Sequence, residues 1–178
     1  MQSKTVLIAV LMSVVAMGVG GVAFTDAEVD RDVNVETAGD SAAVIGLTPG
    51  ATDAASLDDG ALVIDTSTAS ADGLNVDGTF NYGDQDNPET ENTFTLTNND
   101  NSANTITVEY LADNAAGDNV EFYFYDEDQS EIAAVNAGDT EFSNELNSGE
   151  SVDVVMVVNT DALAEDDDLS GTLQISAN

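Results

Sequence analysis

The stretch "YGDQDNPE" holds the side chains whose chemistry is easiest to name. Asp84 and Asp86 alternate there, and Asn87 and Glu89 follow within reach. Carboxylate and amide oxygens are ligands that calcium and sodium ions prefer. The stretch lacks the glycine at position six and the glutamate at position twelve of the EF-hand calcium loop. We therefore favour plain solvation, and keep Asp84, Asp86, Asn87 and Glu89 as candidate ligands for calcium or sodium.

Catalytic side chains are scarce in this chain. It has no histidine and no cysteine, and its two basic residues are Lys4 and Arg31. The usual general base and the thiol nucleophile are therefore absent, and a His-containing zinc site or a Ser-His-Asp triad is excluded. Carboxylate pairs are expected by chance among 35 acids. We predict that the protein is not an enzyme and has no catalytic residue and no cofactor beyond the cation just considered.

The charge of the chain is extreme. A formal net charge of -33 over 178 residues would cause strong self-repulsion at low salt. The Debye length shrinks to about 3 Å at 1 M salt, so this charge suits a surface that faces brine. A hydrophobic content of 42% still allows a folded core. Nucleic acid is excluded as a direct partner, because phosphate binding needs clustered Lys or Arg.

The N-terminus carries a targeting signal. Lys4 precedes an uncharged apolar run that extends to Phe24, and Ala23 and Ala27 are small residues suited to cleavage. We predict a signal peptide over residues 1–27 and a protein that is secreted or held at the cell surface. The alternative is an uncleaved anchor, in which residues 5–24 would span the membrane and be its only contact with lipid.

Residues 28–178 are predicted to form a single all-β domain. Short apolar runs of period two recur, broken by Gly, Asn and Asp clusters. The clearest expected strands are 93–98, 105–111, 120–126 and 151–160, with weaker ones at 29–37, 42–47, 61–66 and 169–176. Eight or nine strands favour a two-sheet β-sandwich of jelly-roll or immunoglobulin-like type, following an N-terminal apolar signal helix.

Three finer expectations follow from the same pattern. The run from Val154 to Val158 is continuously apolar, so strand 151–160 should lie in the middle of a sheet and be buried on both faces. Phe122 and Phe124 should face the core, opposite Tyr123 and Tyr125. A bulge is expected at Gly171, and the stretches 47–60 and 67–92 read as long irregular loops.

The segment 28–37 is an alternating strand at the start of the predicted mature chain. Val29, Arg31, Val33 and Val35 share one face of it. Arg31 is the one cation left after leader removal, and beside an apolar face it can form a bidentate pair with a carboxylate and so fix the register of the strand. The partner carboxylate would belong either to the same domain or to the groove of a neighbouring copy.

The stretch "GGVAFTDAEVDRDVNVETAGDSAAVIGLTPG" (20–50) resembles the opening of a haloarchaeal secreted family of unknown function. The resemblance rests on Phe24, the pair Asp30-Arg31, the valines that follow, Asp40 to Ala43, and Leu47 to Pro49, with "FTLTN" fitting as well. That family is in turn distantly similar to the TasA and camelysin group and to archaeal bundling pilins. This implies a secreted β-sandwich whose N-terminal strand completes a sheet of the next subunit. It supplies no catalytic residue.

Two functions are expected from these observations. The first is a non-enzymatic cell-surface or extracellular filament or matrix subunit of a halophilic archaeon, which polymerises with itself by donating strand 28–37, since a free strand and an unpaired sheet edge suit such pairing. The alternative is a monomeric cell-surface, virion or vesicle module that binds cations or envelope components through its acidic loops.

Overall fold

The computed structural model describes residues 42–66, 74–75, 77–138, 141–161, 163–164 and 167–178. In these residues the chain is all-β, as predicted, with eleven strands and a short 3-10 helix. The predicted signal peptide, the candidate span 5–24 and the strand 28–37 lie outside the described residues. The elements are β1 (Ile45–Pro49), β2 (Ala55–Asp58), β3 (Ala61–Ile64), β4 (Thr79–Tyr82), β5 (Phe94–Asn98), β6 (Asn104–Ala112), η3 (Ala115–Asn119), β7 (Val120–Tyr125), β8 (Glu131–Asn136), β9 (Phe142–Leu146), β10 (Ser151–Asn159) and β11 (Gly171–Ala177).

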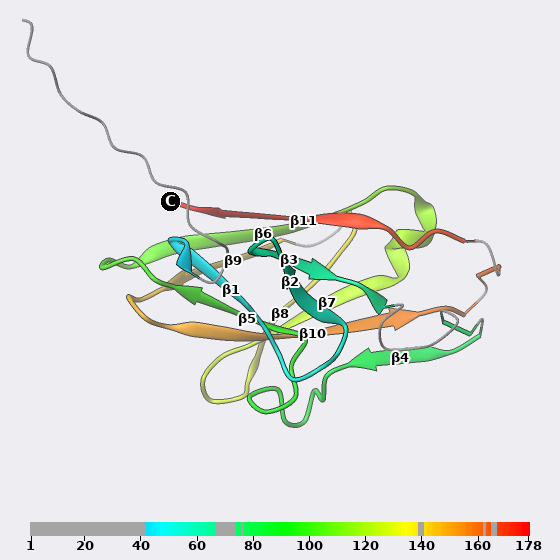
Figure 1. The fold of residues 1–178 in the computed structure, drawn as a ribbon, viewed down its shortest axis with the longest axis horizontal. Helices are drawn as coiled ribbons and strands as arrows, with labels where there is room; N and C mark the ends of the chain where they lie inside the picture. The colour runs from blue at the N-terminus through cyan, green and yellow to red at the C-terminus, as the bar shows by residue number, and fades with distance from the viewer. Residues whose placement is uncertain (1–41, 67–73, 76, 139–140, 162, 165–166) are drawn as a thin grey trace, which may run out of the picture. The chain divides into compact units, whose positions relative to one another are not determined.

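The strands form three antiparallel sheets (Figure 1). The largest has six strands in the order β1-β5-β10-β7-β8, with β4 also paired to β10. A second sheet has the order β11-β6-β9, and the hairpin β2-β3 forms the third. The chain crosses from one large sheet to the other several times, for example from β5 to β6 and from β10 to β11. Such crossings bring edge strands far apart in sequence to the same side of the fold.

Strand β10 lies in the middle of the six-stranded sheet, as its apolar run predicted. It pairs with β7 on one side and with β5 and β4 on the other. Val154 and Val158 belong to the core between the sheets, whereas Val155 is fully buried outside that core cluster. Gly83, at φ +125°, lies against Val155, close enough that an added Cβ would stand 3.1 Å from its Cγ2. Burial on both faces is thereby confirmed at Val155, whereas Ser151, Asp153 and Val157 on the same outer face are half-buried and Asn159 is exposed.

The inner faces of the two larger sheets pack against each other in a sandwich-like arrangement. Two aromatic pairs cross between the sheets: Phe124 of β7 stacks on Phe142 of β9 at 4.6 Å between ring centroids, and Tyr110 of β6 meets Phe122 of β7 edge-on at 5.3 Å. Each such pair contributes about 0.5–1.5 kcal/mol beyond its buried area. The prediction that Phe122 and Phe124 face the core is confirmed. The other large, fully buried side chains of this core are Phe94, Leu96, Ile106, Val108, Val135, Leu146, Val152, Val154 and Val158.

Thr93 joins two strands that lie end to end along β10. Its hydroxyl accepts a hydrogen bond from the Met156 backbone N–H at 2.9 Å and donates to the Tyr82 carbonyl. Its own N–H donates to the Val154 carbonyl at 2.7 Å. Thr93 is 0% exposed, so these backbone groups have no access to water at this point. The side chain therefore continues the hydrogen-bond ladder from β5 to β4.

Asn98 ties the two larger sheets together at the end of β5. Its amide nitrogen donates to the carbonyls of Leu146 and Ser102, both at 2.9 Å, and its carbonyl oxygen accepts from the Asp100 N–H at 3.1 Å. The Asn104 side chain donates to the same oxygen at 3.2 Å. Because Asn98 is 0% exposed, a side chain with both donors and an acceptor is required here.

Four strands were not predicted, namely β2, β4, β8 and β9, so the described residues hold more strands than the eight or nine expected. The stretches 47–60 and 67–92 are therefore not wholly irregular. Asp59 and Gly60, at φ +48° and +88°, form the two-residue turn of the β2-β3 hairpin. An Asp-Gly pair is the usual sequence for this turn, which needs two residues in the left-handed region.

The predicted bulge at Gly171 is wrong. The pairing of β11 with β6 is continuous from Gly171 opposite Ala112 to Ala177 opposite Ile106. The glycine is instead needed for space: a Cβ at this position would stand 2.4 Å from the Tyr110 hydroxyl oxygen. The irregularity that does occur lies between Phe124 and Tyr125, where β7 pairs with β8.

Candidate functional site

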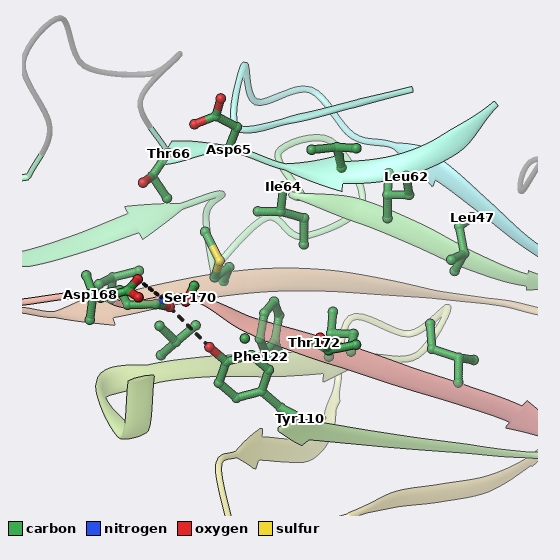
Figure 2. Close-up of a pocket in the computed structure, with 18 residues that line it drawn as sticks. Leu47, Leu62, Ile64, Asp65, Thr66, Tyr110, Phe122, Asp168, Ser170 and Thr172 are labelled. Atoms are coloured by element: carbon green, nitrogen blue, oxygen red, sulfur yellow. Dashed lines mark hydrogen bonds between the residues drawn. The ribbon is translucent and has the colours of Figure 1, made fainter. Parts of the chain in front are cut away.

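An apolar cleft opens between the two larger sheets. Its volume is about 640 Å³, within the range of about 300–1,000 Å³ typical of ligand pockets. Figure 2 shows its lining side chains, which come from six different strands and from the segment that leads into β11. The lining residues are Leu47, Leu62, Val63, Ile64, Asp65, Thr66, Tyr110, Val120, Phe122, Met156, Val158, Asp168, Leu169, Ser170, Gly171, Thr172, Leu173 and Ile175.

Different sheets form the walls of the cleft. The inner face of the six-stranded sheet contributes Phe122, Met156 and Val158 from its two central strands, β7 and β10. The β2-β3 hairpin contributes Leu62 and Ile64, which are half-buried and pack against the main core. A backbone hydrogen bond from the Asp65 N–H to the Ala54 carbonyl, at 2.7 Å, closes the base of this hairpin.

The remaining wall is strand β11. It pairs with β6 on one side, and in the described part of the chain it is the outer strand of its sheet. Its inward side chains, Leu173, Ile175 and Ala177, are only half-buried. The backbone groups along the outer edge of β11 thus pair with no strand in the described part of the chain. Its inward apolar side chains would be buried further by an added strand. Natural proteins usually protect such edges, because they readily pair with another strand.

The cleft has one polar end and one apolar end (Figure 2). Asp65, Thr66, Asp168 and Ser170 lie toward one end, and Leu47 and Leu62 toward the other. The Asp168 carboxylate accepts a hydrogen bond from the Ser170 N–H at 2.9 Å. Both aspartates are exposed, so they stand at the rim rather than in the interior.

The Tyr110 hydroxyl lies at the polar end of the cleft (Figure 2). It donates to the Leu169 carbonyl at 3.3 Å. Burial raises the pKa of this hydroxyl, and the carboxylates of Asp113, Asp118 and Asp168 raise it further. The hydroxyl therefore stays protonated and serves as a hydrogen-bond donor, while the tyrosine ring packs on Phe122.

The cleft is lined mainly by apolar side chains. Its side chains include no histidine, cysteine or lysine. Its two carboxylates, those of Asp65 and Asp168, stand at the exposed rim. The cleft offers apolar surface beside the outer edge of β11, which pairs with no other strand in the described part of the chain. Extended peptides are recognised at such places by strand addition.

The predicted cation ligands form an internally bonded loop. One Asp84 carboxylate oxygen accepts from the Asp86 N–H and the other from the Asn87 side-chain amide, both at 2.9 Å. These two bonds lower the pKa of Asp84, with the Asn87 amide the larger cause. Glu89 instead accepts from the Gln129 side chain at 3.3 Å, on the neighbouring turn.

The four predicted ligands have different hydrogen-bond partners. Asp84 is joined to Asp86 and Asn87, whereas Glu89 is bonded to a different loop. Over the whole described part of the chain, no group of three or more His, Cys, Asp or Glu side chains is placed to hold a metal ion.

Sequence reasoning did not find the cleft. Its residues come from strands that are distant in sequence, and no single stretch marks it. One signal was available: Leu173 and Ile175 alternate with Thr172 and Gln174 in a weak last strand. The predicted assembly residues Val29, Arg31, Val33 and Val35 lie outside the described residues.

Neither a family model nor a curated protein matches this chain. Among the described residues, no helix combines the length and the apolar character needed to cross a membrane.

Proposed function

We propose that this protein is a non-enzymatic, secreted structural subunit of a halophilic archaeon that builds a cell-surface or extracellular filament or matrix. Each subunit would donate its N-terminal strand, residues 28–37, to the cleft of the next subunit. The domain is, in this proposal, a two-sheet sandwich of jelly-roll or immunoglobulin-like type. It would be related to the haloarchaeal secreted family and, distantly, to the TasA and camelysin group.

The observation that carries the proposal is the apolar cleft beside β11. The cleft has a volume of about 640 Å³ and is bordered by half-buried Leu173 and Ile175. An added strand would pair with the outer edge of β11 and cover these side chains. The segment 28–37 has the matching pattern, because Val29, Val33 and Val35 share one face. Burying a valine side chain contributes about 1.5–3 kcal/mol.

Acidic composition favours the same kind of assembly. Subunits that carry so much negative charge repel each other at low salt, and this repulsion is screened in brine. Backbone hydrogen bonds and apolar contacts do not weaken in this way. Strand addition is therefore a suitable means of joining such subunits, and polymerisation should need molar salt.

Electron microscopy of the purified mature protein in high salt tests the proposal. The full mature chain is expected to form filaments, and a variant that lacks residues 28–37 is expected to remain monomeric. Thermal unfolding of the shortened variant shows whether its domain is folded. The proposal is overturned if the full chain stays monomeric over a wide range of protein and salt concentrations, or if the shortened variant polymerises equally well.

A matched substitution separates the cleft from the strand. Leu173→Glu places a charge on the inward face of β11 at the edge of the cleft, and Gln174→Glu places the same charge on the outer face of the same strand. We expect only Leu173→Glu to abolish filaments. Equal loss in both variants would show that charge alone, not the cleft, controls assembly.

A further inference from the structure

We infer that the incoming strand lies parallel to β11, with Arg31 at the polar end of the cleft, so that Arg31 sets both the direction and the register of the strand. This inference rests on the proposed function. It names the residues that would receive the strand and fixes which way the strand runs. The occupant is residues 28–37 of a second copy.

The cleft is polarised in a way that distinguishes the two directions. Strand β11 begins at Gly171, beside Asp168 and Ser170, and runs toward Leu173 and Ile175. Asp65 lies toward the same polar end on the hairpin side of the cleft (Figure 2). A strand laid along β11 therefore meets carboxylates at the start of β11 and apolar side chains farther along.

The donated segment carries a single positive charge on its apolar face. Arg31 alternates with the three valines and is the one basic residue of the chain beyond Lys4. A guanidinium buried among leucines without a partner is strongly unfavourable. Beside a carboxylate it can form paired hydrogen bonds. Arg31 should therefore lie at the polar end, near Asp65 and Asp168, whichever way the strand runs.

The direction then follows from where the valines fall. In a parallel strand with Arg31 opposite Gly171, Val33 lies opposite Leu173 and Val35 opposite Ile175. The spacing of Arg31, Val33 and Val35 matches that of the alternate residues of β11, because alternate residues of any strand are about 6.6–6.8 Å apart. In an antiparallel strand with Arg31 at the same place, only Val29 faces Leu173, and Val33 and Val35 extend past the polar end. The parallel direction buries two valines and the antiparallel direction one.

Charge strengthens the choice of register. Asp30 and Asp32 have the opposite parity to Arg31 and point away from the cleft in either direction. A slip by one residue would turn both aspartates toward Asp168 and would turn Arg31 outward. In a chain with a net charge of -33, the one cation of the donated segment is thus well suited to reject the wrong register.

Engineered disulfides test the direction directly, because the chain has no cysteine of its own. One pair is Val35→Cys with Ile175→Cys, which are adjacent only in the parallel arrangement. The other is Val29→Cys with Leu173→Cys, which are adjacent only in the antiparallel one. The two substitutions of each pair are placed on separate chains, which are mixed in high salt and oxidised, and the products are separated by size under denaturing conditions.

Each outcome has a defined meaning. Covalent dimers from the Val35 and Ile175 pair support the inference, and dimers from the Val29 and Leu173 pair overturn it while leaving strand donation intact. No dimer from either pair overturns the inference. The doubly substituted chain is then oxidised at high dilution: a disulfide between residues 35 and 175 within one chain would show that the strand stays in its own domain, and the proposed function would fail.

Charge exchange tests the role of Arg31. We expect Arg31→Gln to raise the critical concentration for assembly by up to about fivefold, the range of an exposed ion pair. Arg31→Asp should prevent assembly, and its combination with Asp168→Arg or Asp65→Arg should restore it. Asp32→Asn is the matched control, on the same strand with opposite parity, and should have little effect. Assembly unchanged in Arg31→Gln and Arg31→Asp would refute the part assigned to Arg31.

Discussion

Replacing Thr93 by valine tests how β4 is held beside β10. Valine has the same shape as threonine but cannot take part in a hydrogen bond. The substitution removes the acceptor of the Met156 N–H and the donor to the Tyr82 carbonyl. Thr93 is 0% exposed, so water cannot replace the lost partners without opening the sheet.

The expected cost can be worked from these contacts. Each buried backbone group left without a partner costs about 1–3 kcal/mol. The extra methyl group of valine returns about 0.8 kcal/mol. With two such backbone groups, we therefore expect Thr93→Val to lower the free energy of unfolding by about 1–5 kcal/mol. Thr93→Ser, which keeps the hydroxyl, should cost about 1 kcal/mol, the value of one lost methyl group.

Urea unfolding at a fixed molar concentration of potassium chloride measures the effect. Thr107→Val is the matched control, because its hydroxyl lies 3.5 Å from that of Ser143 on an exposed face of the sheet. Such surface changes usually stay within about 0.5 kcal/mol. If Thr93→Val also stays within about 0.5 kcal/mol of the parent at an unchanged denaturant slope, the hydroxyl does not carry the ladder and the reasoning is wrong.

Three further predictions concern single contacts. Gly171→Ala should lower the free energy of unfolding by about 1–3 kcal/mol, because the alanine Cβ meets the Tyr110 ring. In a double-mutant cycle, adding Tyr110→Leu should remove most of this loss, and additive effects of the two substitutions would refute the clash. The hydrogen bond to Glu121, with burial as the second cause, raises the pKa of Tyr123 to about 12. The contribution of this hydrogen bond to stability is therefore complete below pH 10 and is lost as the pH rises toward 12. Glu121→Gln should shift the ultraviolet titration of Tyr123 toward its ordinary pKa of about 10, and no shift would refute the cause. Asn98→Asp should destabilise the protein more than Asn98→Ala at neutral pH and less in acid. The reason is that a buried carboxylate would face the carbonyls of Leu146 and Ser102. Unfolding of the aspartate variant that does not depend on pH would contradict this.

The predicted strands show how far local pattern can lead. The alternation in 93–98, 105–111 and 120–126 and the apolar run in 151–160 each marked a strand that the structure contains. The pattern works because a strand exposes alternate side chains to opposite faces, so a half-buried strand must alternate and a doubly covered one must be apolar. The strands β8 and β9 were not predicted because their patterns do not alternate clearly. In "EIAAVN" two alanines separate Ile132 from Val135, and in "FSNEL" three polar residues separate Phe142 from Leu146.

The loop kept as a candidate cation site, where plain solvation was favoured, illustrates the limit of composition. Asp84, Asp86, Asn87 and Glu89 have the right atoms at suitable spacing, and the backbone nevertheless directs Asp84 to its own loop and Glu89 to Gln129. A carboxylate in a turn readily accepts from the backbone two residues onward, and this local bond competes with a metal ion. Spacing alone cannot tell which use the fold makes of it.

By itself, the sequence determined the all-β class, the central place of β10 and the inward face of Phe122 and Phe124, because each of these depends on the order of apolar and polar residues along one strand. Only the tertiary structure decided that Leu62, Phe122, Met156 and Leu173 line one cleft and that the outer edge of β11 lies beside it. Those residues belong to four different strands, β3, β7, β10 and β11, spread over much of the described chain. Their meeting depends on how the sheets pair and pack, which no local pattern records.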